Sequence, residues 1–243
     1  MDSLWFTASS TLMQSITQWL HGLGVGLPAD TAKVVGDAAA RLDMPALLAL
    51  AAALGWASGV RLYAVVFLTG LSGLMGWVPL PAGLQVLQHP ALLTASCFML
   101  FVEFFADKVP GLDSLWDLLH SVVRVPAGAA LAAAVFGADN TVMALVAGLL
   151  GGSLSATSLA TKMTTRAAVN TSPEPFSNGL VSLFEDGLVL LLMWLALHHP
   201  VVFAVAMVVT LAASVALMVV LFRFLRAVLR RVSRVFSGSP GVA

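Results

Sequence analysis

Charged residues and cysteine are scarce in this chain of 243 residues. Only 10% of the residues are charged, and the formal net charge is zero. Because no broad basic surface is available to neutralise phosphates, nucleic acid is excluded as a partner. The single cysteine, Cys97, lies in an apolar run and has no second cysteine with which to form an intramolecular disulfide. We therefore expect Cys97 to be a small buried hydrophobic residue.

Familiar catalytic motifs are also absent. The sequence contains no P-loop, no Rossmann glycine pattern, no HExxH zinc motif and no nucleophile motif. These absences exclude the enzyme classes that the motifs define. Whether the protein is an enzyme of another kind stays open at this point, and we favour a protein that is not an enzyme.

Apolar residues dominate instead. They make up 59% of the chain, compared with about 45–50% in soluble domains, and they form runs that match the ~20 residues needed to cross a bilayer. We therefore predict an all-α, polytopic membrane helix bundle over residues 46–222, with about six transmembrane helices. The expected spans are 46–75, 90–106, 115–136, 141–168, 179–197 and 201–222.

Two segments flank the predicted bundle. Residues 1–45 contain short amphipathic stretches, at 3–24 and 29–42, that are typical of helices lying at the membrane surface. Residues 223–243 form a basic tail, which we expect to lie in the cytoplasm with anionic lipid as a candidate partner. Apart from the lipid bilayer, the sequence defines neither a protein partner nor an oligomeric state.

The distribution of basic residues predicts the orientation in the membrane. The segments 76–89, 137–140 and 198–200 contain neither lysine nor arginine. Because short cytoplasmic loops retain basic residues and translocated loops lose them, we place these three segments outside. With six spans, both the N-terminus and the C-terminus would then be cytoplasmic.

Small residues and proline suggest how the spans pack. Three spans followed by three more could form a 3+3 inverted repeat, a common transporter design. Gly55 and Gly59 in the first span are spaced to let another helix approach closely. Pro126 predicts a kink or a break in the third span, because proline removes a helical hydrogen bond.

Polar side chains gather between residues 103 and 124. They are Glu103, Asp107, Lys108, Asp113, Asp117, His120 and Arg124. Most are three or four residues apart, which places them in stripes on two helices, and the turn at 109–111 predicts a hairpin whose stripes face each other. No cofactor is evident, but such stripes could pair ions, transfer protons or bind a divalent cation. The candidate metal ligands are Glu103, Asp107, Asp113, Asp117 and His120.

A second polar group is expected on the same cytoplasmic side. It comprises Lys162, Arg166, Asn170, Asn178, Glu185 and Asp186. The two bases could hold a phosphate or carboxylate, although retaining the helix end in the cytoplasm is a simpler reason for their presence. Arg61 lies near the middle of the first span, where a charge is costly, so we expect it to pair with Glu103 or Glu185.

The stretch EFFADKVPGLDSLWDLLHSVVRVPAGAAL resembles a family of bacterial multi-pass membrane proteins known as domain of unknown function 4126. The similarity continues through GVRLY at 59–63 and TKMTTRAAVNTSPEPFSNGLVSLFEDG at 161–187, and covers residues 46–230. The resemblance implies a multi-pass protein of the inner (cytoplasmic) membrane. It implies no particular activity.

Three functions fit these observations. We favour transport or conduction of an ion or small solute through a charged site in the cytoplasmic half of the bundle, because charges at membrane depth often mark solute pathways. One alternative is a membrane-embedded, metal-dependent enzyme that handles lipid or phosphate. The other is a structural scaffold in which the charges serve only to pair with one another.

Overall fold

The computed structural model describes residues 43–109, 111–137, 140–171 and 175–236. These residues form helices and the turns between them, as predicted for an all-α bundle. The elements are α3 (Met44–Leu74), the 3-10 helix η1 (Ala82–Gln88), α4 (Pro90–Ala106), α5 (Leu112–Ala134), α6 (Thr141–Val169), α7 (Pro175–His198) and α8 (Pro200–Phe236). The surface helices predicted at 3–24 and 29–42 lie outside the described residues.

Several of the described helices are long and apolar enough to cross a bilayer. There are 4 of them, α3, α6, α7 and α8, and η1 with α4 makes a fifth if this pair, bent by 69°, is one span. α5 is absent from this set, since polar residues such as Asp117, His120 and Arg124 lower its hydropathy. The chain is therefore a multi-pass membrane helix bundle, and the number of six spans stays a prediction.

α3 is bent sharply in its middle. Its backbone leaves the helical region at Arg61, with φ −143° and ψ 68°. The first arm, residues 44–60, runs alongside α6, because Gly55 packs on Gly151 and the Val60 carbonyl accepts a hydrogen bond from Lys162. The first arm and α6 therefore run in the same direction, and Met44 lies near the start of α6.

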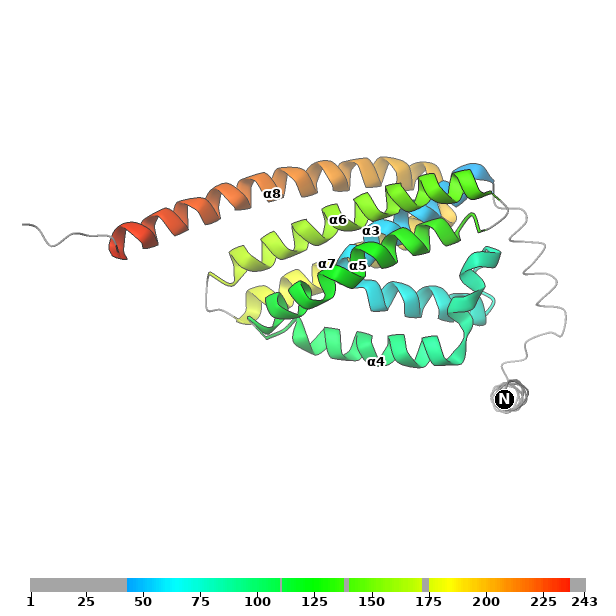
Figure 1. The fold of residues 1–243 in the computed structure, drawn as a ribbon, viewed down its shortest axis with the longest axis horizontal. Coiled ribbons are helices and arrows are strands. Elements are labelled where there is room, and N and C mark those ends of the chain that lie inside the picture. The colour runs from blue at the N-terminus through cyan, green and yellow to red at the C-terminus, as the bar shows by residue number, and fades with distance from the viewer. Residues whose placement is uncertain (1–42, 110, 138–139, 172–174, 237–243) are drawn as a thin grey trace, which may run out of the picture.

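The second arm of α3, residues 62–74, runs back the way the first arm came. Gly70 on this arm packs against Leu93 in the first turn of α4. Gly83 of η1, just before α4, packs against Ala134 at the end of α5, which leads directly into α6. Both ends of α3 thus lie at the same end of the bundle (Figure 1). Arg61, where the helix breaks, is therefore the tip of a helical hairpin. Neither arm alone reaches the ~20 residues of a complete crossing, so α3 has the length of a span only when both arms are counted together.

This hairpin corrects the prediction of a single first span over residues 46–75. A broken helix at membrane depth is tolerated where protein groups satisfy the freed backbone. Lys162 Nζ donates to the Val60 carbonyl at 3.1 Å, and Ser158 Oγ donates to the Trp56 carbonyl at 2.7 Å. α5 is one continuous helix through Pro126, so no break occurs there, and the kink stays a prediction.

The hairpin also changes the arrangement of the chain ends. The start of α3 and the end of α8 lie at opposite ends of the bundle (Figure 1), whereas an even number of crossings between them would place them together. The positions of both termini in the cell stay predictions, because residues 1–42 and 237–243 lie outside the described part. The inverted repeat stays a prediction as well: α3 folds back, but α6, its expected counterpart, is continuous.

Close packing of α3 on α6 fixes the position of the Arg61 tip. A Cβ atom at Gly55 would overlap the Cα of Gly151, and one at Gly59 would overlap the Ser158 hydroxyl and the Ser155 carbonyl. The predicted close approach at Gly55 and Gly59 is therefore confirmed, with α6 as the partner helix. α5 joins the same crossing, since a Cβ at Gly128 would lie 2.7 Å from the Ser155 Cβ.

Gly59→Ala is expected to destabilise the protein by about 1–3 kcal/mol, the usual cost of overpacking a tight contact. The reason is that the added methyl group must displace backbone of α6 and not merely a flexible side chain. Unfolding in mixed micelles, followed by circular dichroism, measures the change. Gly179→Ala in α7 is the matched control, because a Cβ there meets nothing within 4 Å. Equal stability of the two variants would contradict the close packing.

Candidate functional site

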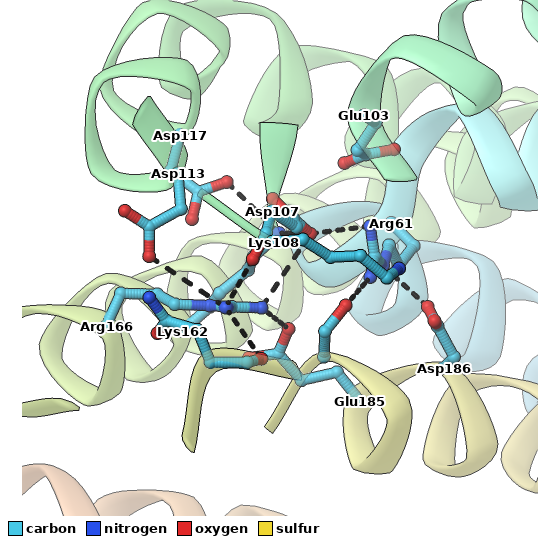
Figure 2. A network of polar contacts seen from close by, with 12 residues as sticks. Arg61, Glu103, Asp107, Lys108, Asp113, Asp117, Lys162, Arg166, Glu185 and Asp186 are labelled. Carbon is cyan, nitrogen blue, oxygen red and sulfur yellow. Dashed lines mark hydrogen bonds and ion pairs between the residues drawn. The ribbon is translucent and has the colours of Figure 1, made fainter. Parts of the chain in front are cut away.

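The polar residues predicted for the site, apart from Lys108 and His120, belong to one connected network of hydrogen bonds and ion pairs. Figure 2 shows the part of this network around Arg61, Asp107 and Arg166. The members are Arg61, Glu103, Asp107, Asp113, Asp117, Arg124, Lys162, Arg166, Asn170, Asn178, Glu185 and Asp186. They come from the tip of α3, the end of α4, the first half of α5, the last turns of α6 and the first half of α7.

Asp107, the residue that ends α4, is the hub of this network. Its Oδ2 lies 2.5 Å from Arg61 Nη1, 3.2 Å from Lys162 Nζ and 3.8 Å from Arg166 Nη2. Its backbone carbonyl accepts a further hydrogen bond from Arg166 Nη1 at 3.0 Å. The Asp107 side chain is completely buried. One carboxylate therefore holds α4 to the tip of α3 and to the end of α6.

Arg124 forms a second junction, between α4 and α5. Its guanidinium donates to Glu103 and to Asp117, both at 2.6 Å. Asp117 also lies 3.1 Å from Lys162, which joins this junction to the Asp107 hub. These contacts bring together the two polar stripes on either side of the turn at 109–111. In that turn Gly111 has φ +87°, a conformation that other residues rarely adopt.

Arg61 is paired, but with partners other than those predicted. Its Nε lies 2.6 Å from Asp186, its Nη1 contacts Asp107, and its Nη2 donates to Ser182 Oγ at 2.6 Å. The predicted partners Glu103 and Glu185 bind Arg124 and Arg166 instead. The difference follows from the hairpin, which carries Arg61 to the end of α4 and against α7.

The remaining contacts close the end of the bundle between α5, α6 and α7. Asn170 donates to Asp113 at 3.0 Å and accepts from Asn178 at 2.9 Å. Arg166 lies 2.9 Å from Glu185. Asp113 also accepts from the backbone N–H of Gly111, so part of its role is to fix the start of α5.

Lys108 and His120 lie outside the network. Lys108 is exposed, with Nζ 2.9 Å from the centre of the Phe104 ring. Partial desolvation and the charge of Arg61 lower the pKa of the Lys108 amine. The His120 ring stacks on Trp116, with 4.0 Å between ring centroids, so His120 does not join the carboxylates. In the described part of the chain, no group of three His, Cys, Asp or Glu side chains could hold a metal ion.

The charges of the network do not balance fully. Arg61, Arg124, Lys162 and Arg166 are opposed by Glu103, Asp107, Asp113 and Asp117, and the side chains of all these residues are at most 1% exposed. Glu185 and Asp186 on α7 are two further acids, with 12% and 32% of their side chains exposed. The network therefore contains more acidic than basic side chains. The two additional acids, Glu185 and Asp186, are its charged members from α7.

Two cavities adjoin the network, one beside each α7 acid. The larger, about 880 Å³, lies between α3, α6, α7 and α8 and includes Glu185 and Lys162 in its wall. The smaller, about 360 Å³, lies between α3, α4 and α7 and includes Arg61 and Asp186. Cys97 lines the smaller cavity and is exposed, which corrects the expectation that it is buried. Apolar side chains form most of both walls.

Three serines of the site were not predicted. Ser155 Oγ donates to the Arg124 carbonyl at 3.1 Å, Ser158 Oγ to the Trp56 carbonyl, and Ser182 accepts from Arg61. A signal for two of them exists in the sequence, because Ser155, Ser158 and Lys162 are spaced by three and four residues and share one face of α6. Ser182 carries no such signal.

The apolar helices and the buried charges together define a multi-pass membrane protein whose bundle encloses an ionic network. Within this class, the chain belongs to the family described as domain of unknown function (DUF4126), which it matches over residues 48–220. The resemblance noted from the sequence is thereby confirmed. No curated protein and no solved structure gives a significant match to the chain.

Proposed function

We propose that the protein transports or conducts an ion or small solute across the bacterial inner membrane, through the charged network and its adjoining cavities. The observation that carries the proposal is the hairpin of α3, whose tip places Arg61 between the buried network and the smaller cavity. Broken helices that present charges at membrane depth are a recurring feature of transporters, where they line the solute pathway.

The orientation follows from the basic residues. The end of α4, the start of α5, the end of α6 and the start of α7, which carry most of the network, lie at the same end of the bundle as the C-terminal end of α8 (Figure 1). Arg223 and Arg226 belong to this part of α8. The described residues of the segments 76–89, 137–140 and 198–200, which lack lysine and arginine, lie at the other end. By the positive-inside rule, the network faces the cytoplasm, and α8 can contact anionic lipid there.

Solute passage requires the network to open, because its central residues are sealed in ion pairs. Asp186 is the member best placed to exchange partners, since 32% of its side chain is exposed and it also lines the smaller cavity. When Asp186 releases Arg61, the guanidinium keeps Asp107 and Ser182 as partners. The α3 tip can therefore change its contacts without leaving a buried charge unpaired.

Asp186→Asn is expected to lower solute flux about tenfold or more, because the side chain that exchanges partners during opening loses the charge with which it would bind the passing solute, a charge-assisted hydrogen bond of ~1.5–3 kcal/mol. The measurement is flux into proteoliposomes, with a panel of sodium, potassium, protons and small organic cations and anions. Asp43→Asn is the matched control, because Asp43 caps α3 at the far end through an oxygen that asparagine retains. Absence of flux for every solute of the panel with the unaltered protein would refute the proposed function.

A further inference from the structure

We infer that the larger cavity binds a hydrophobic organic cation, which would make this chemical class the solute of the proposed transport. The inference rests on the proposed function for its biological meaning, but the binding itself can be tested separately. The cavity is about 880 Å³ in volume, within the range of about 300–1,000 Å³ typical of small-molecule sites. It is also built like such a site, with apolar walls and a few polar groups.

The walls select a ligand with an apolar body. α7 contributes Phe184 and Leu188, and α8 contributes Leu217 and Val220, among other aliphatic side chains. Water forms few favourable contacts with such walls. A ligand with an apolar body is therefore favoured, because it removes this surface from water or replaces loosely packed lipid chains. A small inorganic ion would leave most of the cavity unfilled.

The charged end of the cavity selects a cation. Lys162 donates to the Val60 carbonyl at 3.1 Å and to Asp107 at 3.2 Å, and its ammonium also lies 3.1 Å from Asp117. Its charge is therefore already balanced by two buried carboxylates, which makes it a poor partner for an anion. Glu185 binds Arg166 through Oε2 alone, and 12% of its side chain is exposed. Its second oxygen therefore offers a negative acceptor to the cavity.

Two neutral polar groups support the same assignment. Ser214 of α8 and Trp56 of α3 line the cavity and are 7% and 3% exposed. The Trp56 indole N–H has no hydrogen-bond partner among the described residues. Buried polar groups without partners are uncommon, and a bound ligand would supply the missing hydrogen bonds. Both groups are neutral, so the charge of Glu185 determines which charge the ligand must carry.

The test compares two probes of nearly the same shape and opposite charge, tetraphenylphosphonium and tetraphenylborate. Their binding to the full chain in zwitterionic nanodiscs is measured by equilibrium dialysis, with binding to empty nanodiscs subtracted. The phosphonium is expected to bind saturably and the borate not to bind. Glu185→Gln should weaken phosphonium binding about tenfold, through loss of one ionic partner. Equal binding of the two probes, or an unchanged affinity in Glu185→Gln, would overturn the inference.

A second pair of variants avoids any effect of Glu185→Gln on folding. Ala213→Phe fills the cavity from α8 and should abolish phosphonium binding, whereas Ala212→Phe on the neighbouring, exposed position should leave it intact. Binding that survives Ala213→Phe would overturn the inference. Phosphonium binding without any flux would refute the proposed transport alone, and flux of other solutes without phosphonium binding would refute the organic-cation assignment alone.

Discussion

Asp107→Ala is expected to lower the free energy of unfolding by about 3–5 kcal/mol, the cost of breaking a buried ion pair from one side. Asp107 is the shared partner of Arg61, Lys162 and Arg166, and its removal leaves a buried excess of positive charge at the α3 tip. Water cannot replace the lost carboxylate at a site that is completely buried. The measurement is unfolding by SDS titration in mixed micelles.

Lys108→Ala provides the matched control for this prediction. Lys108 is the next residue in the chain, carries a charge and is exposed, and its ammonium contacts only the Phe104 ring and carbonyl among the interactions resolved. Its replacement should change the stability by no more than about 0.5 kcal/mol, as for most surface positions. If Asp107→Ala were as mild as Lys108→Ala, the hub assigned to Asp107 would be wrong.

Arg124→Leu is expected to have an effect of similar size, about 3–5 kcal/mol, because it leaves two buried carboxylates without their shared base. Glu103 loses Arg124, its ion-pair partner among the described residues, while Asp117 keeps Lys162 at 3.1 Å. The same SDS titration measures the loss. Because Glu103 is the carboxylate left unpaired, replacing it as well should recover part of the lost free energy of unfolding.

Adding Glu103→Leu to Arg124→Leu should restore much of the lost stability. Well-packed apolar residues often replace a buried ion pair at little cost, and Asp117 stays paired with Lys162. This double variant also separates a scaffold from a transporter. A folded double variant that has lost flux indicates that the charges serve transport, whereas full flux would assign the Arg124 junction to structure. A double variant less stable than Arg124→Leu would contradict the pairing itself.

Much of this site could be predicted from the sequence because helical spacing is a local property. Acids three or four residues apart share a helix face wherever the helix lies, and the turn at 109–111 brings the two faces together. The scarcity of charge made the few ionisable residues easy to single out. The approximate set of site residues, from Arg61 to Asp186, follows from these two facts.

Which of the site residues pair with one another could not be predicted, because the pairing depends on where each helix begins, bends and ends. Arg61 lies in an apolar run that reads as a single span, and the glycines at 55 and 59 indicated close packing without naming α6 as the partner. His120 has the spacing of a network member, but aromatic stacking on Trp116 holds it apart. The spacing of residues along a helix shows which helix face they share. It does not show which other helix packs against that face.

The sequence by itself determined the class of this protein, a multi-pass helical membrane bundle with its charges gathered toward one end. Hydrophobic run length and residue spacing are enough for that conclusion, since both act within a single helix. Only the tertiary structure decided that α3 folds back at Arg61, that Asp107 is the hub, and that a cavity opens beside Glu185. These features arise from contacts between helices distant in the sequence, where the energy of satisfying a buried charge outweighs the local preference for a continuous helix.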